Sequence, residues 1–270
     1  MAGPKSASTD REFVQELMDE LTQLSTVVET FKLPTLGRLD GISPEVTMRM
    51  MTTHEEKIRV GSKASFFKTI SSIMNKCVVE PKGLDTYRLT VVDFIFLMYK
   101  LRIISYGKDY KVNLPTCPEC ERALKDPSID LDKLKINYIE NDFSEPFSIK
   151  LPKTGWDIEC RMLRMNEFDE IQTEARKHLE QYPDYEGDPT IPLRLARQIV
   201  TIKGTKLTKA QLEMIVNKLP AEDENKISNT LESIKMGMEL FGEFTCPHCG
   251  KTMMLPLSMS EEFFRPTLDK

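Results

Sequence analysis

Four of the six cysteines in this 270-residue chain form two pairs with the spacing of metal ligands. The first pair reads Cys117-Pro-Glu-Cys120 and the second reads Cys246-Pro-His-Cys249. A tight turn places both thiolates of a pair on one side, and two such turns together offer four sulfurs in the tetrahedral arrangement that structural Zn²⁺ requires. Four cysteine ligands leave no coordination position for water, so the predicted zinc ion is structural rather than catalytic.

Two other uses of these pairs remain open, namely free thiols and thiol–disulfide chemistry. The second pair also matches the active-site tetrad of thioredoxin-class disulfide oxidases, in which the first cysteine caps a helix that lowers its pKa. Redox catalysis would therefore require a Cys246 pKa well below about 8.5. Pro256 forbids a long helix after this pair, which favours zinc over redox chemistry. His248 lies inside the turn and is interpreted as a surface residue rather than a ligand.

The segments that flank the pairs are predicted to be the arms of hairpins. Residues 110–114 and 252–257 have strand-like composition, and Gly250 suits the left-handed position that such turns often need. About 125 residues separate Cys120 from Cys246, so the ion would join distant parts of the chain. We therefore expect metal loss to destabilise the whole fold, because structural zinc contributes on the order of 10–16 kcal/mol to the free energy of folding.

Apolar periodicity predicts an α+β fold that is mostly helical with short strands. Capping patterns mark helix starts at Thr9, Thr90 and Thr208. Cys77 and Cys160 fall on apolar faces and are predicted to be core thiols. The predicted helices span residues 10–31, 66–77, 90–104, 167–182, 189–202, 208–219 and 227–238, and the predicted strands span residues 45–51, 135–139 and 158–163.

The predicted helix over residues 10–31 is amphipathic, and it has no equivalent before the second half of the chain. It ends before Leu33-Pro34, because the residue that precedes a proline is pushed out of the helical region. Its other face is charged, so it either docks on its own domain or lies in a groove of another chain. The predicted partner-binding residues form its apolar stripe, which is Val14, Leu17, Leu21, Leu24, Val28 and Phe31.

Four sequence anchors recur in the same order in both halves of the chain, which predicts an internal duplication. The offsets between paired anchors range from about 110 to about 130 residues, as expected if loops vary more than elements. The paired anchors are Leu33-Pro34-Thr35-Leu36-Gly37 with Leu151-Pro152-Lys153-Thr154-Gly155, 46–50 with 158–162, Glu55 with Glu167, and the two cysteine pairs.

The predicted organisation has three parts. Residues 1–32 form a polar tail and the amphipathic docking helix. Residues 33–135 form a first half-repeat that ends in the Cys117–Cys120 knuckle. Residues 136–270 form a second half-repeat that ends in the Cys246–Cys249 knuckle and a Phe-Phe-Arg-Pro tail, and the zinc site joins the two halves.

Composition indicates a soluble globular protein and argues against a bulk nucleic-acid binder. The chain has 37 Lys and Arg against 42 Asp and Glu, and a formal charge of −5, so it has no domain-wide basic field. Residues 1–10 are small and polar, and we expect neither a signal peptide nor an anchor. Residues 91–104 form the most apolar window, but charged residues interrupt it, which predicts a buried helix rather than a membrane span. Paired cysteines without an export signal point to metal or redox chemistry in a reducing cytosol.

No motif for an enzyme is found in the sequence. The phosphate-binding, dinucleotide-binding, nucleophile-elbow and zinc-protease patterns are missing, and the chain has three histidines. The carboxylate pairs Glu55-Glu56 and Asp169-Glu170 are interpreted as solvated helix faces. We assign no catalytic residue and expect no small-molecule substrate.

Several short motifs follow one another over about residues 33–266. They are Leu33-Pro34 with Gly37, then Glu55, Asp93, Leu101-Arg102 with Ser105-Tyr106-Gly107, the two Cys-Pro-x-Cys pairs, and Phe263-Phe264-Arg265-Pro266. This order resembles the baseplate hub and hub-assembly proteins of contractile-tailed bacteriophages. The resemblance implies a non-enzymatic protein that helps to build, or remains within, the central part of the baseplate. Its implied partners are other tail proteins, with no membrane partner, and its implied location is the host cytoplasm during assembly and the tail baseplate of the virion.

The zinc site is inferred from the four cysteines and not from this resemblance. An alternative function is an intracellular zinc-ribbon protein that binds nucleic acid, although the aromatic residues are not interleaved with Lys and Arg as in stacking platforms. A thiol–disulfide oxidoreductase is a third hypothesis. Phe263 and Phe264 are predicted to pack on the protein's own core, because two adjacent exposed phenylalanines would favour aggregation.

Overall fold

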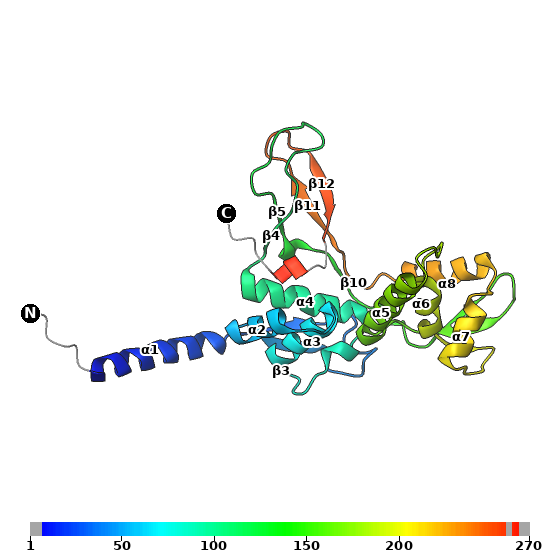
Figure 1. The fold of residues 1–270 in the computed structure, drawn as a ribbon, viewed down its shortest axis with the longest axis horizontal. Helices are drawn as coiled ribbons and strands as arrows, with labels where there is room; N and C mark the ends of the chain where they lie inside the picture. Colours follow the sequence, from blue (N-terminus) through cyan, green and yellow to red (C-terminus); the bar gives the residue numbers. More distant parts are fainter. Residues whose placement is uncertain (1–6, 258–260, 265–270) are drawn as a thin grey trace, which may run out of the picture.

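Two small antiparallel sheets, each flanked by helices, form the two bodies of the molecule in the computed structural model, which describes residues 7–257 and 261–264 (Figure 1). A β-rich arm rises from the first body, and the N-terminal helix α1 (Ala7–Ser25) extends away from it on another side. The chain is thus a mixed α/β protein, as the sequence predicts.

The first body is built on a sheet with the strand order β1-β2-β3, and its core lies between this sheet and the helices. Helix α4 is apolar on all sides, and Phe94, Leu97 and Tyr99 on it are fully buried. The elements of this body are β1 (Val28–Lys32), β2 (Glu45–Arg49), α2 (Thr53–Gly61), α3 (Phe66–Cys77), β3 (Val78–Glu80), the 3-10 turn η1 (Thr86–Arg88) and α4 (Val91–Tyr106).

The second body repeats this plan with a sheet of strand order β7-β8-β9 and a core of its own. Ile149, Ile158 and Leu195 are buried where the sheet meets the helices. The elements are β7 (Phe147–Lys150), β8 (Asp157–Cys160), α5 (Met165–Gln181), α6 (Thr190–Gln198), β9 (Ile199–Ile202), α7 (Lys209–Val216) and α8 (Ala221–Ser233). In both bodies, the chain forms two helices between the second and the third strand of the sheet, although these two strands are neighbours in the sheet.

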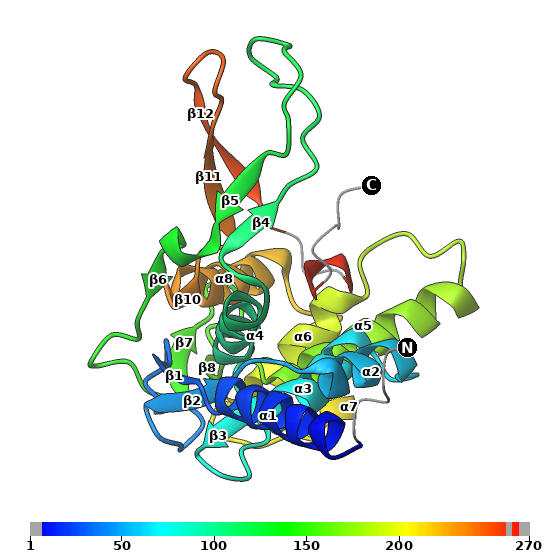
Figure 2. The same ribbon diagram turned by 90° about the vertical axis from the view of Figure 1, so that its left-hand side faces the viewer.

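The arm combines segments from the middle and the end of the chain. Hairpin β4–β5 comes from the middle and hairpin β11–β12 from the end, and β5 lies against β11 (Figures 1 and 2). The short pair β6–β10 and the turn η2 lie near its base. The elements are β4 (Asp109–Lys111), β5 (Ser128–Asp130), η2 (Leu131–Lys133), β6 (Ile136–Asn137), β10 (Gly237–Met238), β11 (Phe241–Thr245) and β12 (Thr252–Pro256).

The two bodies share hydrogen-bonding details at the anchors. In the first body Arg49 donates to the Met50 carbonyl and to Glu55, and in the second Arg161 donates to the Met162 carbonyl and to Glu167. Each glutamate also accepts a backbone N–H from the residue before its helix. The sheet register shifts between residues 47 and 48 in one body and between residues 159 and 160 in the other.

The recurring Leu-Pro-x-x-Gly segments form loops that a buried aspartate closes. Asp93, in the first turn of α4, accepts hydrogen bonds from the backbone N–H and hydroxyl of Thr35. Asp223, in the first turn of α8, accepts the backbone N–H groups of Lys153 and Thr154, at 2.7 and 3.0 Å. The glycines of both loops, at 37 and 155, have φ near +68°, a conformation that a side chain disfavours.

The N-terminal helix is shorter than the sequence predicts. It ends at Ser25, and Val28–Lys32 is strand β1, paired with β2. The β-branched run at 26–28 disfavours a helix, and pairing with β2 satisfies the backbone groups of β1. The predicted capping box at Thr9 is also wrong, because the helix already includes residues 7–10.

Two further predicted helices also end early. The helix predicted over 189–202 ends at Gln198, and Ile199–Ile202 pairs with β8 as strand β9. The helix predicted over 227–238 overlaps α8, which begins earlier, at Ala221, and ends at Ser233, and β10 follows. The predicted strand at 45–51 and the predicted helices at 66–77, 167–182 and 208–219 are confirmed within a few residues.

The side chains of Phe263 and Phe264 pack in the core of the first body, as the sequence predicts. Phe263 and Phe264 are fully buried, and the Phe263 ring lies 4.5 Å from the Tyr99 ring and 5.6 Å from the Tyr110 ring. Arg265 and Pro266 lie outside the described residues. Within the described ranges, no helix has both the length and the hydropathy that a membrane crossing needs.

Candidate metal centre

The two predicted knuckles lie at the ends of the two hairpins of the arm, and both have the same turn geometry. In the first, Cys117 N donates to Arg122 O and Glu121 N donates to Cys117 O. In the second, Cys246 N donates to Lys251 O and Gly250 N donates to Cys246 O. The residue after each pair has positive φ, +57° at Glu121 and +71° at Gly250, so the prediction for Gly250 is confirmed.

The arm brings the four predicted zinc ligands together. All four Sγ atoms of Cys117, Cys120, Cys246 and Cys249 lie within 4.8 Å of one another. The Cys117–Cys249 and Cys120–Cys246 distances between Sγ atoms are both 3.9 Å. A tetrahedron with Zn–S bonds of about 2.3 Å has edges of about 3.8 Å, whereas a disulfide needs about 2.05 Å. The spacing therefore fits four thiolates around one ion and not a disulfide.

The electrostatics of the cluster favour the first ionisation and oppose the next. Burial opposes the Cys246 thiolate, yet the backbone N–H groups of Cys249 and His248 and the neighbouring thiols lower its pKa to about 6. The backbone N–H of Lys251 favours the Cys249 thiolate, but burial and three neighbouring thiols raise its pKa to about 11. A divalent cation would relieve the repulsion among four thiolates, so this donor set suits zinc.

The His248 ring lies outside the cluster of four sulfurs, which agrees with the prediction that His248 is not a ligand. Its Nε2 atom lies 3.0 Å from the carbonyl oxygen of Ala123 in the first knuckle. Its backbone N–H donates to the Cys246 Sγ atom at 3.4 Å. His248 therefore links the two knuckles from outside the cluster.

The structure meets only one of the two requirements for thiol–disulfide chemistry. The lowered Cys246 pKa meets one requirement. In such enzymes the reactive cysteine caps the N-terminus of a helix, whereas here strand β12 follows the pair and begins at Thr252. The other two cysteines, Cys77 and Cys160, are buried core thiols as predicted, and burial raises the pKa of each to about 12.

The predicted partner-binding residues divide between two elements. Val14, Leu17 and Leu21 are exposed on α1. Val28 is exposed on β1, whereas Phe31 on that strand packs against the first core, with its ring 6.5 Å from the Phe96 ring. The side chain of Leu24 lies outside the described part of the structure.

Two carboxylates that were predicted to be solvated are buried. Glu55 is 1 % exposed and pairs with Arg49 at 3.0 Å. Asp169 is 5 % exposed and accepts hydrogen bonds from Ser65 and from the Tyr87 hydroxyl. The prediction is wrong for both because their partners are distant in the sequence or lie on another element.

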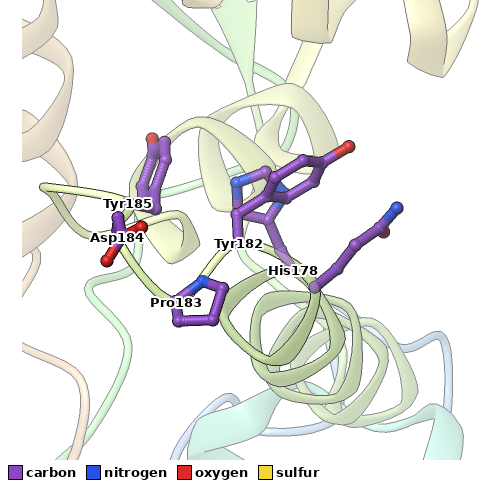
Figure 3. A pocket seen from close by; sticks show the side chains of 6 residues that line it. His178, Tyr182, Pro183, Asp184 and Tyr185 are labelled. Atoms are coloured by element: carbon purple, nitrogen blue, oxygen red, sulfur yellow. The ribbon is translucent and has the colours of Figure 1, made fainter.

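The sequence reasoning also missed a cluster of aromatic rings at the end of α5. His178, Tyr182 and Tyr185 gather around a depression in the surface (Figure 3). The available signal was the Tyr-Pro-Asp-Tyr run, in which proline and aspartate predict a turn that brings two tyrosines together.

The chain matches the model of the family described as T4 bacteriophage base plate protein over residues 25–265. No curated protein and no solved structure matches the chain. The matched range contains both bodies and both cysteine pairs, and it leaves out nearly all of α1.

Proposed function

Because this chain belongs to the family described as T4 bacteriophage base plate protein, we propose that it is a non-enzymatic structural or assembly protein of the baseplate hub. Its partners are other tail proteins, and it acts in the host cytoplasm during assembly and in the tail baseplate of the virion. The observation that carries this proposal is the extent of the family match, which covers the whole scaffold rather than one motif.

The proposed scaffold contains a structural zinc ion bound by Cys117, Cys120, Cys246 and Cys249. Support comes from the Sγ distances of 3.9 Å and from the positive φ after each pair. The ion would hold hairpin β4–β5 against hairpin β11–β12 at the end of the arm, where the local core is small. In this proposal the metal has no catalytic part, because four cysteines fill its coordination sphere.

We also infer that the chain is an internal duplication of two half-repeats. The second spans residues 136–270 as predicted, whereas the first begins at strand β1, at residue 28 rather than residue 33, and ends at residue 135. The equal strand orders, the two shifted registers and the paired Arg–Glu contacts support it. The two buried aspartates support it further, because each closes a Leu-Pro-x-x-Gly loop from the first turn of a helix. Two cysteine knuckles in the same order complete the correspondence.

Helix α1 is the proposed docking element. Phe13, Val14, Leu17, Met18 and Leu21 are between 42 % and 60 % exposed and follow one face of the helix. An exposed apolar stripe of this kind marks an interaction surface. The remaining face is acidic, with Glu12, Glu16, Asp19 and Glu20. The matching partner surface is an apolar groove with Lys and Arg along its rim.

Deletion of residues 1–26 tests the docking role, because it removes α1 and leaves strand β1 intact. We expect a phage that carries only the truncated protein to lose incorporation of this protein into baseplates, while the purified truncated protein stays folded. A finer test compares Leu17→Ser with Leu21→Ser against the control Gln15→Ser with Gln23→Ser, which lies on the polar face. Only the first pair should reduce incorporation.

The two parts of the proposal fail in different ways. Normal incorporation of the truncated protein would overturn docking through α1 and leave the hub role standing. The hub role would be overturned if baseplates form at normal yield without the protein and if the wild-type protein is missing from purified baseplates and from their assembly intermediates.

A further inference from the structure

Helix α5 and its connection to α6 are longer than the corresponding helix and connection of the first body. In the first body α2 has 9 residues, and residues 62–65 join it to α3. In the second body α5 has 17 residues, and residues 182–189 join it to α6. The added length carries His178, Tyr182 and Tyr185, which belong to neither hydrophobic core. The end of α5 projects from the second body (Figure 2).

The three rings form one ordered cluster. The centroid of the His178 ring lies 4.9 Å from the centroid of the Tyr182 ring and 4.7 Å from that of the Tyr185 ring, and the His178 and Tyr185 rings are perpendicular. Backbone hydrogen bonds hold the turn, from Tyr182 N to His178 O and from Tyr185 N to Tyr182 O. Pro183 prevents the helix from continuing. The rings, with Gln181, Pro183 and Asp184, line a depression of about 520 Å³ (Figure 3).

The chain segment that carries this depression is acidic, and Asp184 lines the depression itself. Residues 180–188 contain four carboxylates and no Lys or Arg, although Arg176 and Lys177 precede the cluster on α5. The Asp188 carboxylate is already engaged, since it accepts from the N–H and hydroxyl of Thr190, the first residue of α6. The two tyrosines remain 51 % and 41 % exposed, so part of each side chain is accessible to a ligand.

We propose that the depression lined by His178, Tyr182, Asp184 and Tyr185 binds the guanidinium group of an arginine side chain from a partner protein. A cation is attracted to the face of an aromatic ring, and arginine is the usual cation in such contacts. The planar guanidinium can stack on one tyrosine while it donates to the Asp184 carboxylate, which the compact lysine ammonium does less well. The chain uses the same chemistry internally, where Arg102 lies 5.7 Å from the Tyr110 ring and 5.9 Å from the Phe263 ring.

The test is a titration of the full chain with Nα-acetyl-arginine methylamide, followed by the NMR signals of the Tyr182 and Tyr185 rings. We expect saturable shifts with a dissociation constant in the millimolar range. The matched control ligand is the citrulline analogue, which has nearly the same shape without the charge, and it should bind at least several-fold more weakly. Equal binding of the arginine and citrulline analogues would overturn the proposal.

Variants of the lining residues test whether the aromatic rings themselves bind the guanidinium group. Tyr182→Leu and Tyr185→Leu should each weaken arginine binding roughly twofold to fivefold, whereas the Phe variants should retain it because they keep the ring. Asp184→Asn should weaken binding as well. Tyr138→Leu is the control, because Tyr138 is 43 % exposed and lies outside this cluster. Arginine-induced shifts that persist in the Tyr182→Leu, Tyr185→Leu double variant would place binding elsewhere and refute the assignment.

Discussion

Asp93 and Asp223 perform the same structural task in different electrostatic surroundings. Both close a Leu-Pro-x-x-Gly loop from the first turn of a helix. Burial raises the pKa of Asp93 to about 6, although hydrogen bonds from Thr35 favour its carboxylate. Burial also opposes the Asp223 carboxylate, but the backbone N–H groups of Lys153 and Thr154 prevail and lower its pKa.

The free energy of unfolding of the Asp93→Asn variant, compared with that of the wild type, should increase as the pH rises from 4 to 7. The folded wild type binds more protons than the unfolded chain between about pH 4 and pH 6, because the folded pKa of Asp93 is the higher one. Wild-type stability that depends on this group is therefore present at low pH and lost as the pH rises through 6. The variant lacks this titration, so the difference in free energy of unfolding should shift in its favour by up to about 3 kcal/mol. Urea unfolding at pH 4, 5, 6 and 7 measures it.

Asp223→Asn supplies the contrasting case. The lowered pKa of Asp223 gives stability above about pH 4 that is lost only as the pH falls below that value. Its difference from the wild type should stay constant between pH 5 and 7. If the stability difference from the wild type had the same pH dependence in both variants, burial would not control the pKa of Asp93.

The boundary between α1 and β1 decides which part of the N-terminus is dispensable for folding. Deletion of residues 1–26 should leave the thermal unfolding midpoint unchanged, because the described side chains of α1 from residue 11 to 23 are all exposed. Deletion of residues 1–32 should lower the midpoint by several degrees, since it removes the pairing of β1 with β2 and the Phe31–Phe96 contact. Circular dichroism melting curves compare the two truncations. Equal midpoints would mean that β1 adds nothing to the first body.

The close approach of β11 to β5 depends on Gly242. A Cβ atom at this position would lie 2.2 Å from Cγ2 of Ile129, which is itself buried in the first core. Gly242→Ala should therefore destabilise the protein by about 1–3 kcal/mol. Ile129→Ala removes the obstructing atom, so the double variant should be more stable than the sum of the single changes predicts. Strict additivity in denaturant unfolding would place the strain somewhere else.

At the scale of the whole molecule, the cysteine cluster lies away from the contact between the two bodies. The bodies meet where Thr90 and Arg164 form a β-bridge, and where Arg164 also reaches Asp40 and Glu145. The cluster instead joins the ends of the two hairpins of the arm (Figure 1). Metal loss is thus expected to affect the arm first, rather than the whole molecule at once as the sequence suggested.

We expect one zinc ion per chain in protein purified without chelator, and none in the variant with all four clustered cysteines replaced by serine. Hydrogen exchange in that variant should increase over residues 109–130 and 237–257, while α4 keeps its protection, because its core does not include the cluster. Native mass spectrometry and hydrogen exchange measure these outcomes. Wild-type protein without bound metal would refute the zinc proposal, and loss of protection throughout α4 would show that the ion supports the whole fold.

The sequence by itself determined the local chemistry of this protein. It identified the four clustered cysteines, the left-handed position of Gly250, most of the helices and the family resemblance, which the family match supports. These features are readable because turn chemistry, capping and apolar periodicity act over a few residues. The recurring Leu-Pro-x-x-Gly and Arg-Met anchors were visible too, although their hydrogen-bond partners were not.

Only the tertiary structure decided which short segments became strands and which carboxylates were buried. Val28–Lys32 and Ile199–Ile202 continue an apolar helical pattern, and pairing with a distant strand makes them β1 and β9. Glu55 and Asp169 look like solvated residues until Arg49 and Tyr87 are placed beside them. Such outcomes depend on contacts between residues far apart in the chain or on different elements, and local propensity carries no information about these contacts.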